Sequence, residues 1–509
     1  MTASKELKRR DVLKIGLFST ASLAMGKSIA AVNSSESKRK FVDEFIELDA
    51  ISQAQLIRNK KVSAEELTQA AIDRIKRLNP SINAVVSTFF DEAIIQAKNG
   101  LPSGPFSDVP YLVKDLVDYK GHRTSQGSRM FMNNISESSH VYIDAAQNAG
   151  FNILGKTNTP EFGIMPTTEP LAFGPTANPW DLAHSPGGSS GGAAAAVASG
   201  MVPIAQGSDG GGSIRIPASC CGLFGLKVSR RRNVWPGKLA VRGFDVKGHL
   251  SRTVRDTAVA LAATEWQGDN AHFSPVGVVK GPSAKRLKIG LVMESMTGQL
   301  PDADVKEATF STASLCQKLG HHIEEVTLPF DQEKFTDAFM LVMSEGVGNF
   351  VNYMTQKMNR KPNVQELEPW TLYLADYYEK HGGAVAVERA ANYCHEITEQ
   401  MEVLFKNYDV LLSPVLTKIP IRTGEQSPII TGDKLKQAGL DYIGYTPLYN
   451  ATGQPAMSVP LNWNSQGLPV GSQFATKLGG EQTLLALAYE LEQARPWKDK
   501  WAPNSAFYL

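Results

Sequence analysis

Hydrophobic and polar positions along the chain follow two periods, one typical of helices and one typical of buried strands. Residues 49–79 predict two amphipathic helices, in which Ile72, Ile75 and Leu78 repeat at the spacing of one helical face. Short apolar runs such as 111–113 predict buried strands instead, because every residue in them is hydrophobic. The two kinds of segment together predict a protein built from both helices and strands.

Strand-like and helix-like segments alternate through most of the chain. Strands are predicted at 111–113, 151–154, 201–205, 288–292, 322–326, 410–412, 455–460 and 469–475, and helices at 142–150, 193–200, 305–319 and through most of 331–400. This alternation is typical of an α/β fold with a large, mainly parallel or mixed sheet. No stretch rich in proline, glycine and serine divides residues 45–509, so we expect one domain there.

Composition limits the partners that the chain is expected to have. Of 509 residues, 42% are hydrophobic and 20% are charged, which is ordinary for a soluble globular protein. The net charge of +1 gives no reason to expect nucleic acid as a partner. The four cysteines have no metal-binding spacing, so we expect buried free thiols and no metal site.

The first 30 residues differ in kind from the rest of the chain. A basic start that includes Arg9 and Arg10 precedes a mostly apolar run at 15–25, and small residues follow it. This is the pattern of a secretory signal, too short to span a bilayer stably, and the paired arginines resemble a bacterial twin-arginine signal. We therefore predict a signal at 1–30, a flexible start at 31–44 and a periplasmic or secreted protein. The alternative is an amphipathic N-terminal helix on a cytoplasmic protein.

Two serines in glycine-rich loops are the candidate chemical site. Ser189 lies inside the run Gly187–Gly192, and Ser213 follows Gly210–Gly212, 24 residues further on. Glycine lets the backbone turn tightly and bring its N–H groups close to a ligand. Backbone N–H groups beside a serine can stabilise an oxyanion, so the loops suit acyl transfer.

The same residues allow other interpretations. Residues 187–191 fit the G-x-S-x-G elbow of α/β-hydrolases, which would make Ser189 the nucleophile with a downstream Asp and His as partners. The available histidines, none in a context that marks it as catalytic, are His249, His321, His322, His381 and His395. A phosphate-binding loop is disfavoured, because Ala193 stands where its lysine would follow Gly192.

Five separated blocks, in order, resemble the amidase signature family. They are Pro110–Asp115, Gly155–Glu161, Asn178–Trp180, the serine region from Ser185 through Pro217 to Lys227, and Thr452–Ala456. The resemblance covers about residues 45 to 500. It implies the amidase signature fold, an α/β single domain with a large twisted mixed β-sheet flanked by helices.

The resemblance also implies roles for particular residues. The family's Ser–cis-Ser–Lys triad falls on Ser213 as the acylated nucleophile, Ser189 as the proton shuttle and Lys114 as the base. The peptide between Gly188 and Ser189 is expected to be cis. The oxyanion hole is expected from the backbone amides of Gly210, Gly211, Gly212 and Ser213. A cycle of this kind requires no metal and no organic cofactor.

The chemistry of Lys114 supports this assignment independently of the family. A serine hydroxyl is a weak nucleophile and needs an adjacent base. A lysine serves as that base only when neutral, and burial at the end of an apolar strand lowers its pKa. Lys114 has this context more clearly than Lys156 or Lys227. The alternative for Lys114 is an ion pair with a carboxylate such as Asp115.

Residues around the serines are expected to hold or to line the site. Asp209 and Arg215 flank Ser213, and charged residues in glycine-rich turns usually fix the backbone by hydrogen bonds. Thr168, Glu169 and Trp180 are candidates for walls of the site, without an assigned role. Aromatic residues of the helical segment either line an apolar acyl pocket or pack in a helix core; they are Trp370, Tyr373, Tyr377 and Tyr378.

The expected activity is hydrolysis of a carboxylic amide, linear or cyclic, with a small-molecule amide as substrate. The turn at 167–170, the block at 178–180 and the end at 496–497 are similar to those of aminohexanoate cyclic-dimer hydrolases. One alternative is the glutamine-hydrolysing subunit of a tRNA-dependent amidotransferase, which an export signal argues against. Another is a binding module that has kept the fold without the activity. We expect no stable insertion into a membrane, and a homodimer is a further expectation.

Overall fold

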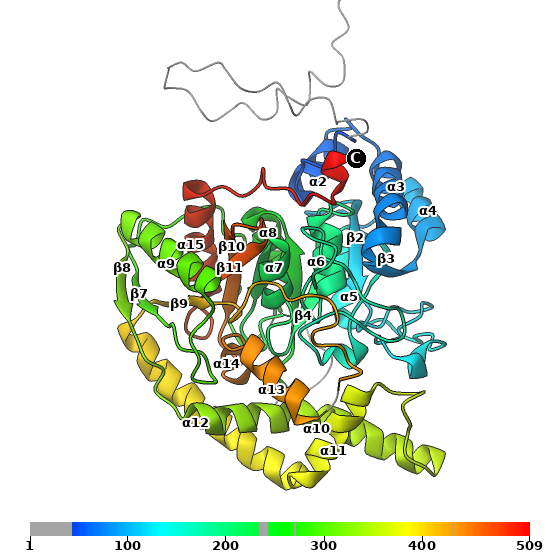
Figure 1. Ribbon diagram of the computed structural model, residues 1–509. Coiled ribbons are helices and arrows are strands. Elements are labelled where there is room, and N and C mark those ends of the chain that lie inside the picture. The colour runs from blue at the N-terminus through cyan, green and yellow to red at the C-terminus, as the bar shows by residue number, and fades with distance from the viewer. Residues whose placement is uncertain (1–42, 234–242, 269–270, 431) are drawn as a thin grey trace, which may run out of the picture.

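The computed structural model describes residues 43–233, 243–268, 271–430 and 432–509. Within these ranges, eleven strands form one mixed sheet (Figure 1). From one edge to the other the strands are β1 (Val85–Thr88), β3 (Phe151–Thr157), β2 (Val109–Lys114), β4 (Ile204–Asp209), β6 (Val246–Ser251), β5 (Phe224–Lys227), β10 (Ala456–Trp463), β11 (Pro469–Ala475), β9 (Val410–Pro414), β7 (Lys288–Leu291) and β8 (His322–Glu325). The predicted signal at 1–30 and almost all of the predicted flexible start lie outside the described residues.

The sheet mixes parallel and antiparallel neighbours. Strand β2 is parallel to both β3 and β4, and β7 is parallel to both β8 and β9. The strands between these two groups pair antiparallel, from β4 through β6, β5, β10 and β11 to β9. The expected fold class, a large mixed α/β sheet flanked by helices, is confirmed.

Helices flank the sheet and form an outer arm. Outside the arm the α-helices of the described ranges are α2 (Ala50–Arg58), α3 (Ala64–Ile82), α4 (Phe90–Asn99), α5 (Val141–Asn148), α6 (Gly191–Ala198), α7 (Arg215–Cys221), α8 (Val254–Thr264), α9 (Ala303–Lys318), α13 (Asp433–Tyr442), α14 (Pro447–Ala451) and α15 (Glu481–Ala494). The arm consists of α10 (Gln332–Met358), α11 (Pro369–Lys380) and α12 (Gly383–Asn407), which run along the bottom of the view (Figure 1).

Most segments predicted from the hydrophobic pattern are present, and one is displaced. The strand predicted at 201–205 is wrong in position, because β4 begins at Ile204 and runs on to Asp209. Residues 201–203 form a buried bend instead. Pro203 has no N–H to donate to a sheet ladder, which favours a start after it. The shift makes Asp209 the last residue of a central strand.

The core around the serine loops is built from small residues. All eight residues of α6 are buried, and its alanines pack with Leu112 of β2, Ala205 of β4 and Ile214 beside the second serine. Small side chains let this helix lie close to the strands, which brings the loops at its two ends near the sheet. Among the helices of the described ranges, none is long and apolar enough to cross a membrane.

Candidate active site

Strand β2 carries a lysine into the interior of the protein. All six of its residues are buried, and the last of them, Lys114, has no exposed surface. The Lys114 backbone N–H donates to Gln206 Oε1 at 2.9 Å. Its ammonium nitrogen Nζ lies 2.6 Å from Ser189 Oγ and 3.2 Å from Ser208 Oγ. Lys114 therefore contacts two serine hydroxyls, and one of them belongs to Ser189 in the first glycine-rich loop.

The surroundings of Lys114 favour its neutral form. Burial lowers the pKa of Lys114 from its usual value to about 7, because the ammonium loses its hydration. The charge of Asp245 opposes this shift by raising the pKa, and the charge of Lys247 lowers it again. A large fraction of Lys114 is therefore neutral near pH 7, as a general base requires.

Burial does not by itself separate Lys114 from the other two lysines considered in the sequence. Lys156 and Lys227 are also fully buried, and burial lowers the pKa of each. Lys156 Nζ lies 3.6 Å from Asp115 Oδ1, and Lys227 Nζ donates to two backbone carbonyls. The ion pair weighed for Lys114 with Asp115 is thus made by Lys156. What distinguishes Lys114 is its serine contacts.

The turn that carries Ser189 is held tightly. The peptide bond between Gly188 and Ser189 is cis, as the resemblance implied. Thr168 Oγ1 donates to the Gly187 carbonyl at 2.9 Å and accepts from the Gly191 N–H at 3.2 Å. A Cβ on Gly188 would lie only 2.4 Å from the Thr167 carbonyl oxygen, so a side chain does not fit there. Ser189 is 2% exposed and its hydroxyl is fixed against Lys114.

The three residues suggested as walls of the site hold the backbone. Thr168 braces the Ser189 turn, as described above. Glu169 Oε2 accepts from the Gly424 N–H at 2.9 Å, and Trp180 Nε1 donates to the Cys221 carbonyl at 2.8 Å. Their observed contacts are therefore structural.

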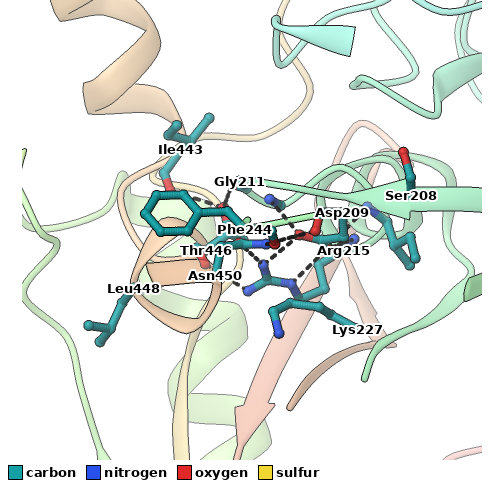
Figure 2. Close-up of polar contacts among 12 residues, drawn as sticks. Ser208, Asp209, Gly211, Arg215, Lys227, Phe244, Ile443, Thr446, Leu448 and Asn450 are labelled. Atoms are coloured by element: carbon teal, nitrogen blue, oxygen red, sulfur yellow. Dashed lines mark hydrogen bonds and ion pairs between the residues drawn. The ribbon is translucent and has the colours of Figure 1, made fainter. Parts of the chain in front are cut away.

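The loop that carries Ser213 is closed by a buried ion pair. Asp209 ends β4 and Arg215 begins α7, and both side chains are fully buried. Arg215 Nε and Nη2 donate to the two carboxylate oxygens of Asp209 at 2.9 and 2.8 Å (Figure 2). The Ser190 N–H donates to the Ser213 carbonyl at 3.3 Å, which joins the two serine loops. The expected loop-holding role of Asp209 and Arg215 is confirmed.

The four amides expected to form an oxyanion hole are not equivalent. The Gly212 N–H donates to Asp209 Oδ1 at 2.8 Å, and Gly212 is buried. Gly210, Gly211 and Ser213 are partly exposed. The Gly212 amide is therefore engaged in holding the loop, which leaves three of the expected donors as candidates.

An aromatic side chain that the sequence did not single out lies over this loop. A Cβ on Gly211 would lie 3.1 Å from Cζ of Phe339, which belongs to α10. Phe244 stacks on Phe339 with ring centroids 6.0 Å apart. Phe339 occurs in a helix with many apolar residues, so no sequence signal separated it from the helix core. The outer arm therefore reaches the candidate site.

The aromatic residues that were considered for an acyl pocket pack within the arm and against its neighbours. Trp370 Nε1 donates to the Ile164 carbonyl at 3.2 Å, and Tyr373 donates its hydroxyl hydrogen to Asp433 Oδ1 at 2.7 Å. Tyr377 and Tyr378 are buried in the same hydrophobic cluster as Trp370. The structure thus agrees with the helix-core interpretation of these residues.

Within the described part of the chain, no histidine is among the hydrogen-bond partners of Lys114 and Ser189. His249 is buried among aromatic rings, and burial lowers its pKa to about 3. His321 contacts Glu490, His322 contacts Glu324, and His381 contacts the Tyr377 carbonyl. The elbow interpretation, in which Ser189 would use a histidine, therefore has no support in these contacts.

Two residues that hold Lys114 were missed in the sequence. Gln206 and Ser208 both contact it, and both lie on β4. Residues two apart on a strand share a face. A strand predicted at 204–209 would therefore have placed Gln206 and Ser208 on the same face. The error in the position of β4 therefore hid them.

The fold and the cluster define the class of protein as a hydrolytic α/β enzyme, with a buried lysine held against a serine beside a glycine-rich loop. The sequence profile of the amidase family matches residues 66–485. The chain belongs to the amidase signature family, and it is an amidase.

Relatives and solved structures agree with this assignment. The chain is 35% identical over 474 residues to AmiC of Mycobacterium tuberculosis (strain ATCC 25618 / H37Rv), a match that covers 92% of this chain and 98% of the relative. It is 32% identical over 483 residues to the 6-aminohexanoate-cyclic-dimer hydrolase of Paenarthrobacter ureafaciens, a match that covers 88% of this chain and 95% of the relative. A solved 6-aminohexanoate cyclic dimer hydrolase with substrate superposes with a TM-score of 0.83 at 29% identity, covering 90% of this chain and 99% of the other.

Proposed function

We propose that the protein hydrolyses a carboxylic amide through an acyl-enzyme on Ser213, with Ser189 and Lys114 as the proton relay. The observation that carries the proposal is the contact of 2.6 Å between Lys114 Nζ and Ser189 Oγ, made by a fully buried lysine. The burial that lowers the pKa of Lys114 to about 7 supports its role as a base.

The proposed reaction begins with proton transfer along the relay. Neutral Lys114 takes the proton of the Ser189 hydroxyl, and Ser189 takes the proton of the Ser213 hydroxyl. The Ser213 oxygen attacks the amide carbonyl, and the carbonyl oxygen becomes an oxyanion. We assign the stabilising N–H groups to Gly210, Gly211 and Ser213, because the Gly212 N–H donates to Asp209. Loss of one such donor typically lowers the rate about 100–1,000-fold.

Collapse of the tetrahedral intermediate breaks the carbon–nitrogen bond. Ser189 donates a proton to the leaving nitrogen, and the ammonium of Lys114 returns its proton to Ser189. The amine departs and leaves an ester on Ser213. A water molecule then attacks this ester, and its proton passes through Ser189 to Lys114. As the bond between the acyl carbon and the Ser213 oxygen breaks, the proton returns from Lys114 through Ser189 to the Ser213 oxygen, and the carboxylic acid is released. The relay ends in the protonation state in which it began.

The substrate class is proposed to be small carboxylic amides, with cyclic amides among them. The relative that is named for a cyclic dimer of 6-aminohexanoate supports the inclusion of cyclic amides. The test is a panel of simple, aromatic, fatty and cyclic amides together with glutamine, assayed with the wild-type protein and with Ser213→Ala. Hydrolysis of at least one amide by the wild type, lost in folded Ser213→Ala, supports the proposal. Equal activity of the two proteins would contradict it.

Glutamine in the panel tests the amidotransferase alternative. A protein that released ammonia from glutamine and from no other amide would favour that alternative over a free-standing amidase. A protein that bound amides without hydrolysing any would favour the binding module.

We also propose export and self-association, which are separate from the chemistry. The basic start with Arg9 and Arg10 and the apolar run at 15–25 support export through a twin-arginine route, with cleavage near Ala30. N-terminal sequencing of the protein from a periplasmic fraction tests this, and a cytoplasmic protein that starts at Met1 or Thr2 would contradict it. Sedimentation of the purified protein tests the homodimer, and a monomer at all concentrations would contradict it.

A further inference from the structure

A chain of hydrogen bonds links Asp115, the residue after Lys114, to Glu161 through the turn at 125–128. Asp115 accepts the backbone N–H of Ser125 at 3.3 Å and also binds its hydroxyl. Three residues further on, Ser128 donates its hydroxyl hydrogen to Glu161 Oε1 at 2.6 Å. Because Asp115 directly follows Lys114, the turn at 125–128 links the lysine strand to Glu161.

Glu161 is a buried carboxylate that binds segments from different parts of the chain. It is 1% exposed. Its Oε2 accepts the backbone N–H of Glu368 at 2.8 Å and the hydroxyl of Thr371, both at the start of α11. One oxygen thus holds the turn at 125–128 and the other holds the outer arm. A charged acceptor forms stronger hydrogen bonds than a neutral one, so this carboxylate fixes both partners firmly.

The short helix that begins at Glu161 passes beside the Ser189 hydroxyl. This is the 3₁₀-helix η3 (Glu161–Gly163). Gly163 has a φ of +70°, and a Cβ on it would lie 3.2 Å from Ser189 Oγ and 2.6 Å from Cδ1 of Leu116. Gly163 therefore lies beside the hydroxyl that contacts Lys114. No side chain fits at this position without moving a neighbour.

Two more hydrogen bonds fix the turn around Gly163. The Phe162 N–H donates to the Gln126 carbonyl at 2.8 Å, and Trp370 Nε1 donates to the Ile164 carbonyl at 3.2 Å. The turn is thus bound on one side to the segment that includes Gln126 and on the other to α11. These are the same two segments that the Glu161 carboxylate binds.

We propose that Glu161 is a positioning residue for amide hydrolysis, which holds Gly163 against the Ser189 hydroxyl and couples that hydroxyl to α11. Glu161 acts through Gly163 and does not touch the reacting atoms. The inference rests on the proposed role of Ser189 as proton shuttle. A small displacement of a catalytic group lowers the chemical rate more than it weakens substrate binding, so the effect belongs in kcat.

The first test compares Glu161→Gln with a matched buried carboxylate elsewhere. Glu481 is fully buried and accepts the Ser229 N–H and an Arg232 N–H, at 2.7 and 3.0 Å. We expect Glu161→Gln to lower kcat about 10- to 100-fold with KM changed less than about 3-fold. We expect Glu481→Gln to lower the melting temperature while kcat stays within about 2-fold of wild type. A wild-type kcat in folded Glu161→Gln would overturn the inference.

The second test asks whether Glu161 acts through Gly163. Gly163→Ala places a methyl group against Ser189 and is expected to lower kcat on its own. If both variants displace the same hydroxyl, the double variant loses little more activity than the worse single variant. Fold-changes that multiply would mean two independent effects and would overturn the inference. If Glu161→Gln does not fold, Thr371→Val and Ser128→Ala are used instead, because each removes a hydroxyl that donates to Glu161. An unchanged kcat in both variants would also overturn the inference.

Labelling of Ser213 by a fluorophosphonate separates this inference from the proposed function. A wild-type protein that neither hydrolyses amides nor takes the label contradicts the proposed function itself. A wild-type protein that is labelled at Ser213, with Glu161→Gln labelled at the same rate, contradicts only the positioning role. Labelling slowed about 10-fold or more in Glu161→Gln, with the wild-type rate in Glu481→Gln, supports it.

Discussion

Arg215 and Asp209 form a fully buried ion pair across the loop that carries Ser213, with Arg215 Nη2 2.8 Å from Asp209 Oδ1. The guanidinium also donates to Asn450 Oδ1 at 2.6 Å (Figure 2). A further N–H of the guanidinium donates to Gln473 Oε1 at 2.8 Å. Burial alone would raise the pKa of Asp209, but the charge and hydrogen bonds of Arg215 outweigh it and hold the pKa well below its usual range. The pair fixes the two ends of the serine loop.

Removal of one partner from this pair is expected to destabilise the protein strongly. Asp209→Asn leaves the Arg215 charge buried without a counter-charge, a change that typically costs about 3–5 kcal/mol of unfolding free energy. Urea denaturation measures the loss. The exposed ion pair of Lys361 with Asp376 supplies the control, because Lys361→Ala is expected to change stability little. Equal stabilities of Asp209→Asn and the wild type would contradict the assigned role.

The pH dependence of hydrolysis is expected to follow the titration of Lys114. Only the neutral amine can accept a proton, and the pKa of Lys114 is lowered to about 7. The value of kcat/KM on an uncharged amide should therefore rise as the pH rises through about 7 and level off above it. Initial rates between pH 5 and 9 measure this. A rate that falls, or stays flat, between pH 6 and 8 would mean that another group is the base.

The charge of Asp245 is expected to tune the same titration. Its carboxylate raises the pKa of Lys114 against the larger effect of burial. Asp245→Asn removes that charge, so the rise of kcat/KM should move to lower pH. The rate profiles of wild type and variant, measured side by side with the same uncharged amide, show the direction of the shift. A shift to higher pH would contradict the assignment of the titrating group to Lys114.

The carboxyl group of Glu368, whose pKa is raised by burial and by the charge of Glu161, is expected to make the stability of the protein depend on pH. Burial, followed by the charge of Glu161, raises the pKa of Glu368 from 4.5 to about 8. The folded protein thus keeps a proton that the unfolded chain loses, and stability falls as the pH rises from about 4.5 to about 8. Glu368→Gln has no charge to bury.

Thermal melting at two pH values tests this effect of Glu368. Relative to wild type, Glu368→Gln should gain on the order of a few kcal/mol more stability at pH 8.5 than at pH 4.5. A difference between the two proteins that is the same at both pH values would show that Glu368 does not titrate in this range.

Local patterns predicted the elements of the fold well, because each depends on residues close in sequence. The helices at 142–150 and 305–319 and the buried strand before Lys114 are present with small changes at their ends. The displaced strand at 201–205 shows the limit of such patterns. Its apolar residues are compatible with a buried bend as well as with a strand. Only the pairing of β4 with β2 and β6, which begins at Ile204, decides between the two.

The site was predictable where a motif carried it and not where distant segments meet. Lys114, Ser189 and Ser213 stand in recognisable blocks, and Lys114 does contact Ser189. Glu161 ends the recognisable block at 155–161, but its role, like that of Phe339, comes from contacts with residues far away in sequence and could not be assigned in advance. Glu161, for example, accepts the N–H of Glu368, which lies 207 residues further along the chain and directly precedes α11.

The most direct test of the central claim is to find which serine becomes covalently modified. The protein is treated with a fluorophosphonate, digested and mapped by mass spectrometry, with Ser213→Ala and Ser189→Ala as matched variants. The account predicts a single label on Ser213, absent in Ser213→Ala and formed far more slowly in Ser189→Ala, where the relay is broken. A label on Ser189, or no label on the active wild-type enzyme, would contradict it.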